Sequence, residues 1–323
     1  MLQIKQALAV IFCLFATIGN AQFTDVINSN RPGESMAAFS VGKTIFQAEV
    51  GIYGMRQKFD SENLESRGLG SELALRYGAF FEQLEFILEL QYQRDRIETG
   101  GTHYIQNGLK QATIGGKFLI YDPNKHYQKK PNLYSWKANH SFSWREFIPA
   151  VGVYAGVNLN LFDNPYAFPN EETATPKAMI LTQNQFGRWV LVGNFIVDKI
   201  ISNYMSYGYI ITVTRGFNER WSGFLENQGT KSDFYSDMIF RGGAAFLIKE
   251  NIQIDASIGA NVKDTPSMLT AGIGLSWRFD DNYEDVILRA PGEEKSKEDK
   301  KKDKEKDKAK KRLDGIEGEE KTK

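Results

Sequence analysis

Apolar and polar residues alternate with a period of two along the middle of the chain. In the run Leu84–Tyr92 every second residue is leucine, phenylalanine or tyrosine, and Glu85, Ile87, Glu89 and Gln91 fall between them. A helix would instead repeat its apolar residues at three and four positions, so this alternation predicts β-strands. The run also has the length of a tilted strand that crosses a bilayer, about 9–11 residues.

Similar alternation, interrupted by turn residues, recurs along the chain and predicts about 12 strands. An even number of antiparallel strands suits a closed barrel with both chain ends on one side. The expected strands are Thr44–Phe59, Gly70–Phe80, Gln83–Asp95, Leu109–Tyr121, Glu146–Leu161, Lys177–Phe186, Trp189–Asp198, Met205–Thr214, Glu219–Gln228, Asp237–Ile248, Gln253–Asn261 and Met268–Phe279.

Alternation alone also fits a water-soluble sandwich, whose apolar face would form the core. In a membrane barrel the apolar face contacts lipid and the polar face lines the interior. Long strands, aromatic residues near strand ends such as Trp189 and Trp221, and a signal sequence favour the barrel. The last strand ends in Phe279, which resembles the closing strand of bacterial outer-membrane barrels, although this chain continues beyond it. We therefore predict an all-β, transmembrane, antiparallel up-and-down β-barrel.

The beginning of the chain has the features of a signal peptide. Lys5 is followed by the apolar run Ala7–Ile18 and by the small residues Gly19-Asn20-Ala21, which predicts cleavage after residue 21. The only cysteine, Cys13, lies inside this peptide, so the mature chain would contain no thiol.

The end of the chain differs sharply in composition. From Glu293 onward Lys, Glu and Asp dominate and aromatic residues are absent, so this part is expected to be disordered or a solvated helix. We predict four parts: a signal peptide over 1–21, a periplasmic segment over 22–43, an outer-membrane barrel over 44–280 and a charged periplasmic tail over 281–323.

Charged residues fall on the face of the predicted strands that would line the barrel. Two interpretations follow: ion pairs that fill and rigidify a small barrel, or a polar lining that selects solutes. Arg76 on one strand and Glu49 and Glu85 on neighbouring strands are the first pairing expected. The full set of lining candidates is Glu49, Glu72, Arg76, Glu85, Glu89, Lys117, Glu226, Asp255 and Arg278.

Catalytic and nucleic-acid functions find little support in the sequence. The formal net charge is zero, and a nucleic-acid binder needs a basic face. His103, His126 and His140 fall in predicted loops without the spacing of a metal site, and no nucleophile and base share a strand face. We predict no catalytic residue, metal site or cofactor, and a protein that is not an enzyme.

Several short motifs carry a resemblance to a known family. They are Asn30-Arg31-Pro32 followed by Gly42 and Gln47–Gly51, Leu75–Gly78 with Leu84-Glu85, Glu219–Trp221 with Phe224–Glu226, and Asn251–Asp255. In these motifs the chain resembles the MetA-pathway of phenol degradation family of outer-membrane transporters, over most of residues 30–279. The resemblance implies a barrel that acts as a transporter or channel, and it does not include the Lys/Glu tail.

Two functions are therefore expected. The first is an outer-membrane channel or transporter for small molecules, aromatic or apolar ones among them. The alternative is a structural or accessory barrel in an envelope complex, with the tail as its contact. Expected partners are outer-membrane lipid, the barrel assembly machinery during biogenesis and, through residues 283–323, an envelope protein or the cell wall. An open bore would favour transport, and a filled bore would favour the accessory role.

Overall fold

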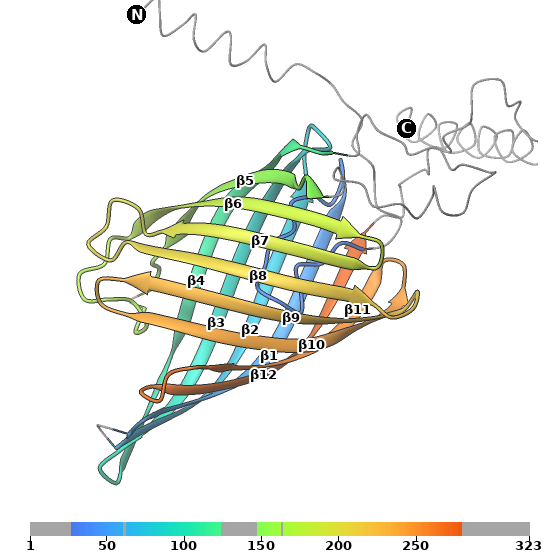
Figure 1. Cartoon of the computed structure of the whole chain (residues 1–323). Helices are drawn as coiled ribbons and strands as arrows, with labels where there is room; N and C mark the ends of the chain where they lie inside the picture. Colours follow the sequence, from blue (N-terminus) through green and yellow to red (C-terminus); the bar gives the residue numbers. More distant parts are fainter. Residues whose placement is uncertain (1–26, 61–62, 124–146, 163, 280–323) are drawn as a thin grey trace, which may run out of the picture. The chain divides into compact units, whose positions relative to one another are not determined.

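The computed structural model describes residues 27–60, 63–123, 147–162 and 164–279. In these residues twelve antiparallel strands form one closed barrel, in which every strand pairs with its neighbours in sequence and β1 pairs with β12 (Figure 1). The predicted fold is confirmed. The strands are β1 (Phe46–Phe59), β2 (Leu64–Gly78), β3 (Leu84–Thr99), β4 (Thr102–Tyr121), β5 (Ala150–Leu159), β6 (Ala174–Phe186), β7 (Trp189–Asp198), β8 (Ser206–Gly216), β9 (Trp221–Ser232), β10 (Ser236–Lys249), β11 (Ile252–Asn261) and β12 (Ser267–Phe279).

Contacts divide the chain into two units, residues 1–281 and residues 282–323. The barrel belongs to the first unit. The predicted signal peptide, residues 1–21, and the predicted tail, residues 281–323, lie outside the described residues.

The outer surface of the barrel is apolar, as a lipid-facing surface requires. Large apolar side chains point outward on successive strands, and Ile258 on β11 and Ile273 on β12 expose 59% and 64% of their surface. Their neighbours in the strands, such as Asp255 and Ser276, are buried on the inner side. An apolar outside around a polar inside is the arrangement of a transmembrane barrel. Among the described residues, no helix is long and apolar enough to cross a membrane.

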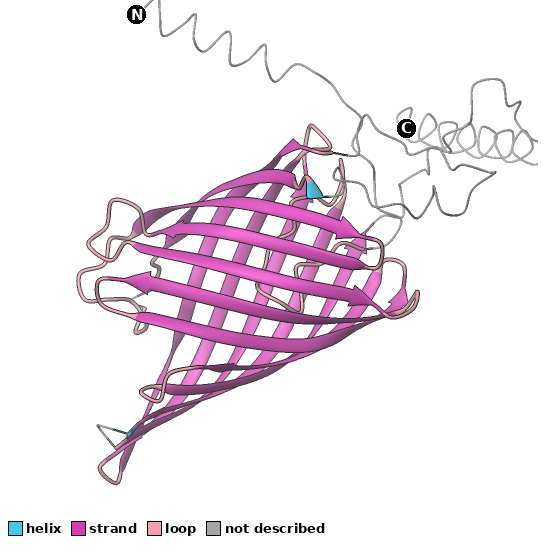
Figure 2. Ribbon diagram, in the orientation of Figure 1, coloured by secondary structure: helices cyan, strands magenta, loops and turns pink. Residues whose placement is uncertain are grey.

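The sheet is uneven in length. We call the end where β1 begins the near end and the opposite one the far end. Strands β1–β4 have 14 to 20 residues, whereas β5, β7 and β11 have 10, and Figure 2 shows the β1–β2 and β3–β4 hairpins extending past the rest of the far end.

The predicted bounds of the long strands were too short at the far end. The strand predicted from Gly70 begins at Leu64, the one predicted to end at Asp95 ends at Thr99, and the one predicted from Leu109 begins at Thr102. Backbone pairing continues there although the outward residues change from apolar to charged, so the hydrophobic alternation stops before the hydrogen bonds do.

Candidate functional site

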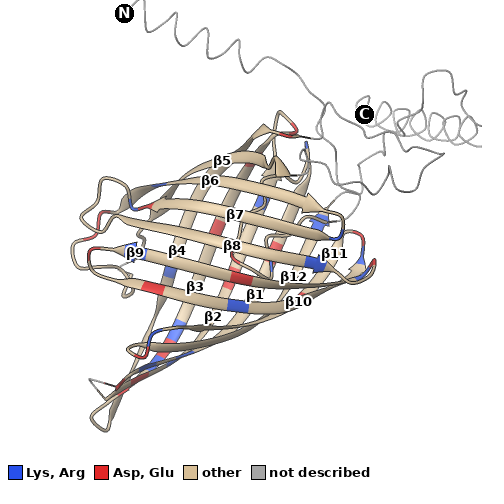
Figure 3. Ribbon diagram, in the orientation of Figure 1, with Lys and Arg blue, Asp and Glu red and all other residues tan. Residues whose placement is uncertain are grey.

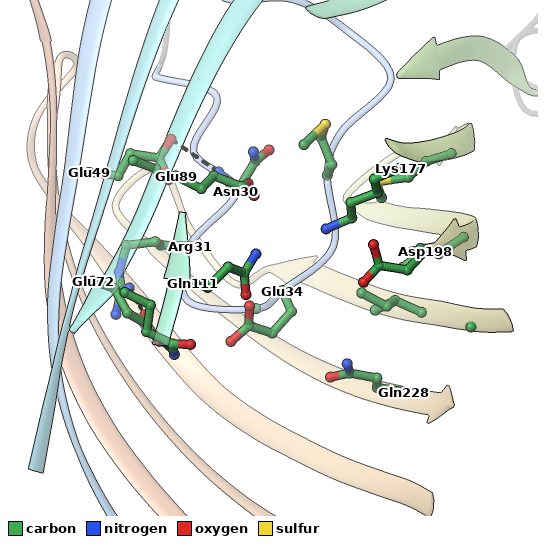
Figure 4. A pocket seen from close by; sticks show the side chains of 18 of the residues that line it. Asn30, Arg31, Glu34, Glu49, Glu72, Glu89, Gln111, Lys177, Asp198 and Gln228 are labelled. Carbon is green, nitrogen blue, oxygen red and sulfur yellow. Dashed lines mark hydrogen bonds and ion pairs between the residues drawn. The ribbon is translucent and has the colours of Figure 1, made fainter. Parts of the chain in front are cut away.

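The bore of the barrel contains a stretch of the chain itself, residues 27–43, which we call the inner segment. It starts at the near end, where the Ile27 amide donates to the carbonyl oxygen of Glu250 in the β10–β11 turn at 2.8 Å. It returns to the same end, where the Thr44 amide donates to the Gly78 carbonyl oxygen at 2.8 Å. Between these points it crosses the bore and contacts opposite walls (Figure 4).

This position differs from the periplasmic location predicted for residues 22–43. The stretch lacks the alternation of a strand and has only the short apolar run Met36–Phe39, so no strand was predicted there. Buried backbone amides and carbonyls need hydrogen-bond partners, and the inner wall of the barrel supplies them. Residues 22–26 lie outside the described part of the chain.

Arg31 is fixed in a notch in the barrel wall. Gly51 on β1 and Gly274 on β12 face each other in register, and a Cβ atom added at either one would overlap the Arg31 guanidinium. On the two sides of the notch, Arg31 Nη1 lies 2.8 Å from Glu72 Oε2 and Nη2 lies 3.4 Å from Asp255 Oδ1. The glycines admit the side chain and the carboxylates neutralise it.

A second anchor is a cluster of buried charges on β1–β4. Arg76 is fully buried, and its Nη1 lies 2.8 Å from Glu49 Oε1 while its Nε lies 2.5 Å from Glu85 Oε1. Lys117 Nζ lies 3.0 Å from the other oxygen of Glu85. The predicted pairing of Arg76 with Glu49 and Glu85 is therefore confirmed. Charges so deeply buried are tolerated because each one has an opposite partner.

This buried cluster also binds the backbone of the inner segment. Each of its four members makes at least one such hydrogen bond, so the ion pairs and the segment stabilise each other. The bonds run from Arg76 Nη1 to the Asn28 carbonyl (2.7 Å), from Lys117 Nζ to the Phe39 and Ala37 carbonyls (2.8 and 3.1 Å), from the Val41 amide to Glu85 Oε2 (3.0 Å) and from the Asn30 amide to Glu49 Oε1 (3.3 Å).

On the opposite wall, Glu226 of β9 accepts two amides of the inner segment. The amides of Glu34 and Ser35 donate to Glu226 Oε2 at 3.0 and 3.3 Å. Thr212 Oγ1 donates to the same oxygen at 2.7 Å, and Arg241 forms an ion pair with Oε1. The Glu226 carboxylate thus connects the segment to β8 and β10, the two strands that flank β9.

Neutral amide side chains complete the attachment. Asn194 of β7 accepts the Met36 amide at 2.6 Å and donates to the Met36 carbonyl at 2.8 Å, and Gln183 of β6 accepts the Ala38 amide at 3.1 Å. Asn194 and Gln183 were not among the predicted lining residues, all of which are charged. The sequence feature that could have identified them is a side-chain amide on the inward face of a strand whose other residues are mostly apolar.

The inner segment also forms a small apolar core within the bore. Met36 and Ala38 pack in one buried cluster with Ile87, Leu119 and Leu181 from the walls. At this level side chains of the segment pack directly against side chains of the walls.

Cavities remain in the bore beside the inner segment. The larger of two, of about 300 Å³, and the smaller, of about 200 Å³, both border Asn30, Arg31 and Gly33. Met179, Ile196 and Ile210 give the larger one an apolar wall, and Glu89 and Lys177 project into it from opposite sides (Figure 4). Its charged lining consists of five carboxylates and two cations: Glu34, Glu49, Glu72, Glu89 and Asp198 with Arg31 and Lys177.

All nine lining candidates lie on the inner side of the barrel, and most of them bind the inner segment. Glu89 instead faces the larger cavity, and Arg278 is buried on β12. The seven that contact the segment are Glu49, Glu72, Arg76, Glu85, Lys117, Glu226 and Asp255. Among the described residues, no group of three or more His, Cys, Asp or Glu side chains is arranged to hold a metal ion.

Comparison with known proteins identifies the family. Residues 29–279 match the model of the family described as "Putative MetA-pathway of phenol degradation". The chain belongs to this family. No curated protein matches it.

Several solved structures resemble this family member. An outer membrane channel from Pseudomonas putida F1 is 10% identical, with a TM-score of 0.49 over 78% of this chain and 100% of the channel. The KdgM porin is 7% identical, with a TM-score of 0.43 over 72% and 99% of the two chains. The CymD monoaromatic hydrocarbon channel is 8% identical, with a TM-score of 0.41 over 73% and 89%.

Proposed function

We propose that the protein is an outer-membrane channel for small molecules, and that the inner segment closes it in the conformation described above. The observation that carries the proposal is that seven inward charged residues hold a segment of the chain across a bore that has cavities beside it. Family membership and the apolar outer surface of a closed barrel support the channel and its location.

The inner segment can move without opening the barrel wall. The hydrogen-bonded ladder closes from β1 to β12 without any residue of the segment. The segment is held by hydrogen bonds and ion pairs to the wall, and hydrogen bonds to charged groups contribute about 1.5–3 kcal/mol each. Displacement toward the near end would let water enter the bore and hydrate these charged groups in place of the segment, which is what a gate requires.

The larger cavity indicates the kind of solute. Its volume of about 300 Å³ exceeds the engineered cavity of roughly 150 Å³ that binds benzene. Three apolar side chains offer a surface for a ring, and the excess of carboxylates repels anions. We propose small neutral or cationic molecules with a single ring, a class that agrees with the phenol degradation named in the family description.

A reversible lock on the inner segment tests the gate. Ser29 Oγ lies 2.7 Å from Ser276 Oγ of β12, and the mature chain is expected to lack cysteine, so the variant S29C/S276C offers one defined disulfide. In planar bilayers the oxidised variant should not conduct. After reduction it should open as often as the unmodified protein, and S29C alone should not respond to the oxidant.

The same preparation tests the solute. The flux in excess of that into protein-free liposomes should be faster for phenol and aniline than for benzoate, which has the same ring and a negative charge. Equal conductance of the oxidised and reduced S29C/S276C variant would show that the segment does not close the bore. If benzoate crossed as fast as phenol and aniline, the proposed selectivity would be wrong, and the proposal that the protein is a channel would still stand.

An accessory barrel is the second candidate, and the filled bore favours it. A bore held shut by buried ion pairs serves a structural protein equally well. A variant without residues 29–40 that folds as a barrel and conducts nothing would support this role against the channel. In that case a pull-down with and without residues 283–323 should recover a partner only when the tail is present.

A further inference from the structure

Arginines line up across the outer surface of the long hairpins. Arg56 of β1 is directly opposite Arg67 of β2, and Arg67 is directly opposite Arg96 of β3. The three side chains point outward, and they are 51%, 64% and 58% exposed. We call these three residues, together with Lys58 and Arg94 on the same face, the arginine patch.

The patch begins where the apolar surface ends. On β3 the outward residues are apolar or aromatic from Leu84 to Tyr92, and the next two are Arg94 and Arg96. The apolar stretch of nine residues matches the length that spans a bilayer, about 9–11 residues. Figure 3 shows basic positions, with acidic ones among them, at the far end of these strands. The patch therefore lies at the level where lipid headgroups replace acyl chains.

Carboxylates on the described strands balance its charge only in part. Glu65 Oε1 lies 2.8 Å from Nε of both Arg56 and Arg67, and Glu98 Oε1 lies 3.0 Å from Arg96 Nε. Within the described parts of β1, β2 and β3, five basic side chains thus share two carboxylates on this face, and Asp60 follows Lys58 just beyond the end of β1. Like charges directly opposite each other destabilise a sheet, and each guanidinium has five donors, of which one carboxylate uses only a part.

We propose that the arginine patch binds the phosphate groups of a glycolipid in the outer leaflet. The planar fork of arginine matches phosphate oxygens in pairs, and three forks on adjacent strands, which lie about 4.8 Å apart, would bind a headgroup that carries more than one phosphate. The proposal rests on the outer-membrane location proposed above and on a far end that faces the outer leaflet, as expected for a barrel whose chain ends lie on the periplasmic side, but it does not require that the bore conducts.

Binding of fluorescent bisphosphorylated lipid A to the full-length protein in detergent tests this proposal, with anisotropy as the readout. The variant R56Q/R67Q/R96Q should bind about tenfold more weakly, because each exposed ion pair contributes modestly. The control R188Q/R220Q/K249Q removes the same charge from exposed residues of the near end and should bind like the unmodified protein. Conductance of both variants should be unchanged.

Three outcomes would overturn the proposal. The first is equal loss of binding in both triple variants. The second is equally tight binding of lipid A from which the phosphates have been removed. The third is competition by inorganic phosphate at the concentration at which lipid A itself binds, which would assign the patch to a free anion. None of these outcomes would alter the conductance test of the gate.

Discussion

The inner and outer faces of β1–β3 carry the same types of charged residue in opposite situations. On the inner face, Arg76 is fully buried between Glu49 and Glu85 and also donates to a backbone carbonyl. On the outer face, Arg67 is exposed and shares one carboxylate with Arg56. The inner charges have their partners within the chain, whereas the chain neutralises the outer charges only in part.

This difference follows from water and geometry. A charge that is buried without partners costs several kcal/mol, so the inner face must satisfy its groups within the fold, and it does so with opposite charges and the inner segment. The outer residues are hydrated beyond the apolar band and can remain only partly neutralised, since exposed ion pairs contribute little. A bound partner is therefore optional for folding on the outer face and necessary on the inner one.

The largest effect should come from removing the central inner charge. Arg76→Met would leave Glu49 and Glu85 buried with one cation fewer, and we expect a loss of about 3–5 kcal/mol in the free energy of unfolding. On the same sheet Arg96→Met removes an exposed arginine and should cost less than about 1 kcal/mol. Urea unfolding of both variants in the same detergent measures the difference.

Similar losses in the two variants would contradict the contrast between the faces. A second substitution controls for misfolding of Arg76→Met. Arg76→Lys keeps the positive charge but lacks the planar guanidinium group. It should fall between the unmodified protein and Arg76→Met, because it can pair with only one of the two glutamates at a time.

The next effect concerns the hold on the inner segment. Glu226→Gln removes the charge that accepts the amides of Glu34 and Ser35, and hydrogen bonds to charged groups contribute about 1.5–3 kcal/mol. The segment should open more often while the barrel ladder is unaffected. Hydrogen exchange at these two amides should therefore accelerate at least tenfold.

Exchange on β9 and β10 serves as the internal control for Glu226→Gln. If those strands accelerate as much as the segment, Glu226 stabilises the whole barrel and not the segment in particular. A gate is identified by the difference between the hydrogen-exchange rates of the segment amides and those of the strand amides.

The sequence predicted the barrel because one physical rule covers every strand. Alternation requires only that one face meet lipid and the other the interior, as at Leu84–Tyr92. The same rule failed at the far end, where Arg67 and Arg96 replace apolar outward residues although the strands continue. Strand pairing there depends on backbone bonds, which hydrophobic patterning does not register.

The inner segment was missed for a different reason. Its position depends on partners distant in sequence, such as Glu226 and Asn194, and no local pattern in residues 27–43 encodes them. One signal was nevertheless present. The nine inward candidates comprise six carboxylates and three cations, so further donors had to come from elsewhere, and Arg31 with the amides of the segment supplies them.

A smaller effect should follow from filling the notch that receives Arg31. In Gly51→Ala the added methyl would displace the guanidinium from its place between Glu72 and Asp255. Loss of about 1 kcal/mol of attachment would raise the open probability roughly fivefold. Gly54→Ala is the matched control on the same strand, because nothing lies within 4 Å of its added Cβ. Equal open probabilities would show that the notch does not hold the gate.

The smallest effect compares one substitution on the two faces. Glu65→Gln on the outer face removes a carboxylate that both Arg56 and Arg67 share, just as Glu226→Gln does for the donors inside. Inside, the carboxylate is the binding group, so its loss weakens the attachment of the segment. Outside, the carboxylate competes with the proposed lipid phosphate, so its loss should strengthen lipid A binding a few-fold. This gain should shrink as salt is added, since exposed charges are screened. Weaker lipid binding by Glu65→Gln would mean that Glu65 orients the arginines for their ligand, and the two faces would then use their carboxylates in the same way.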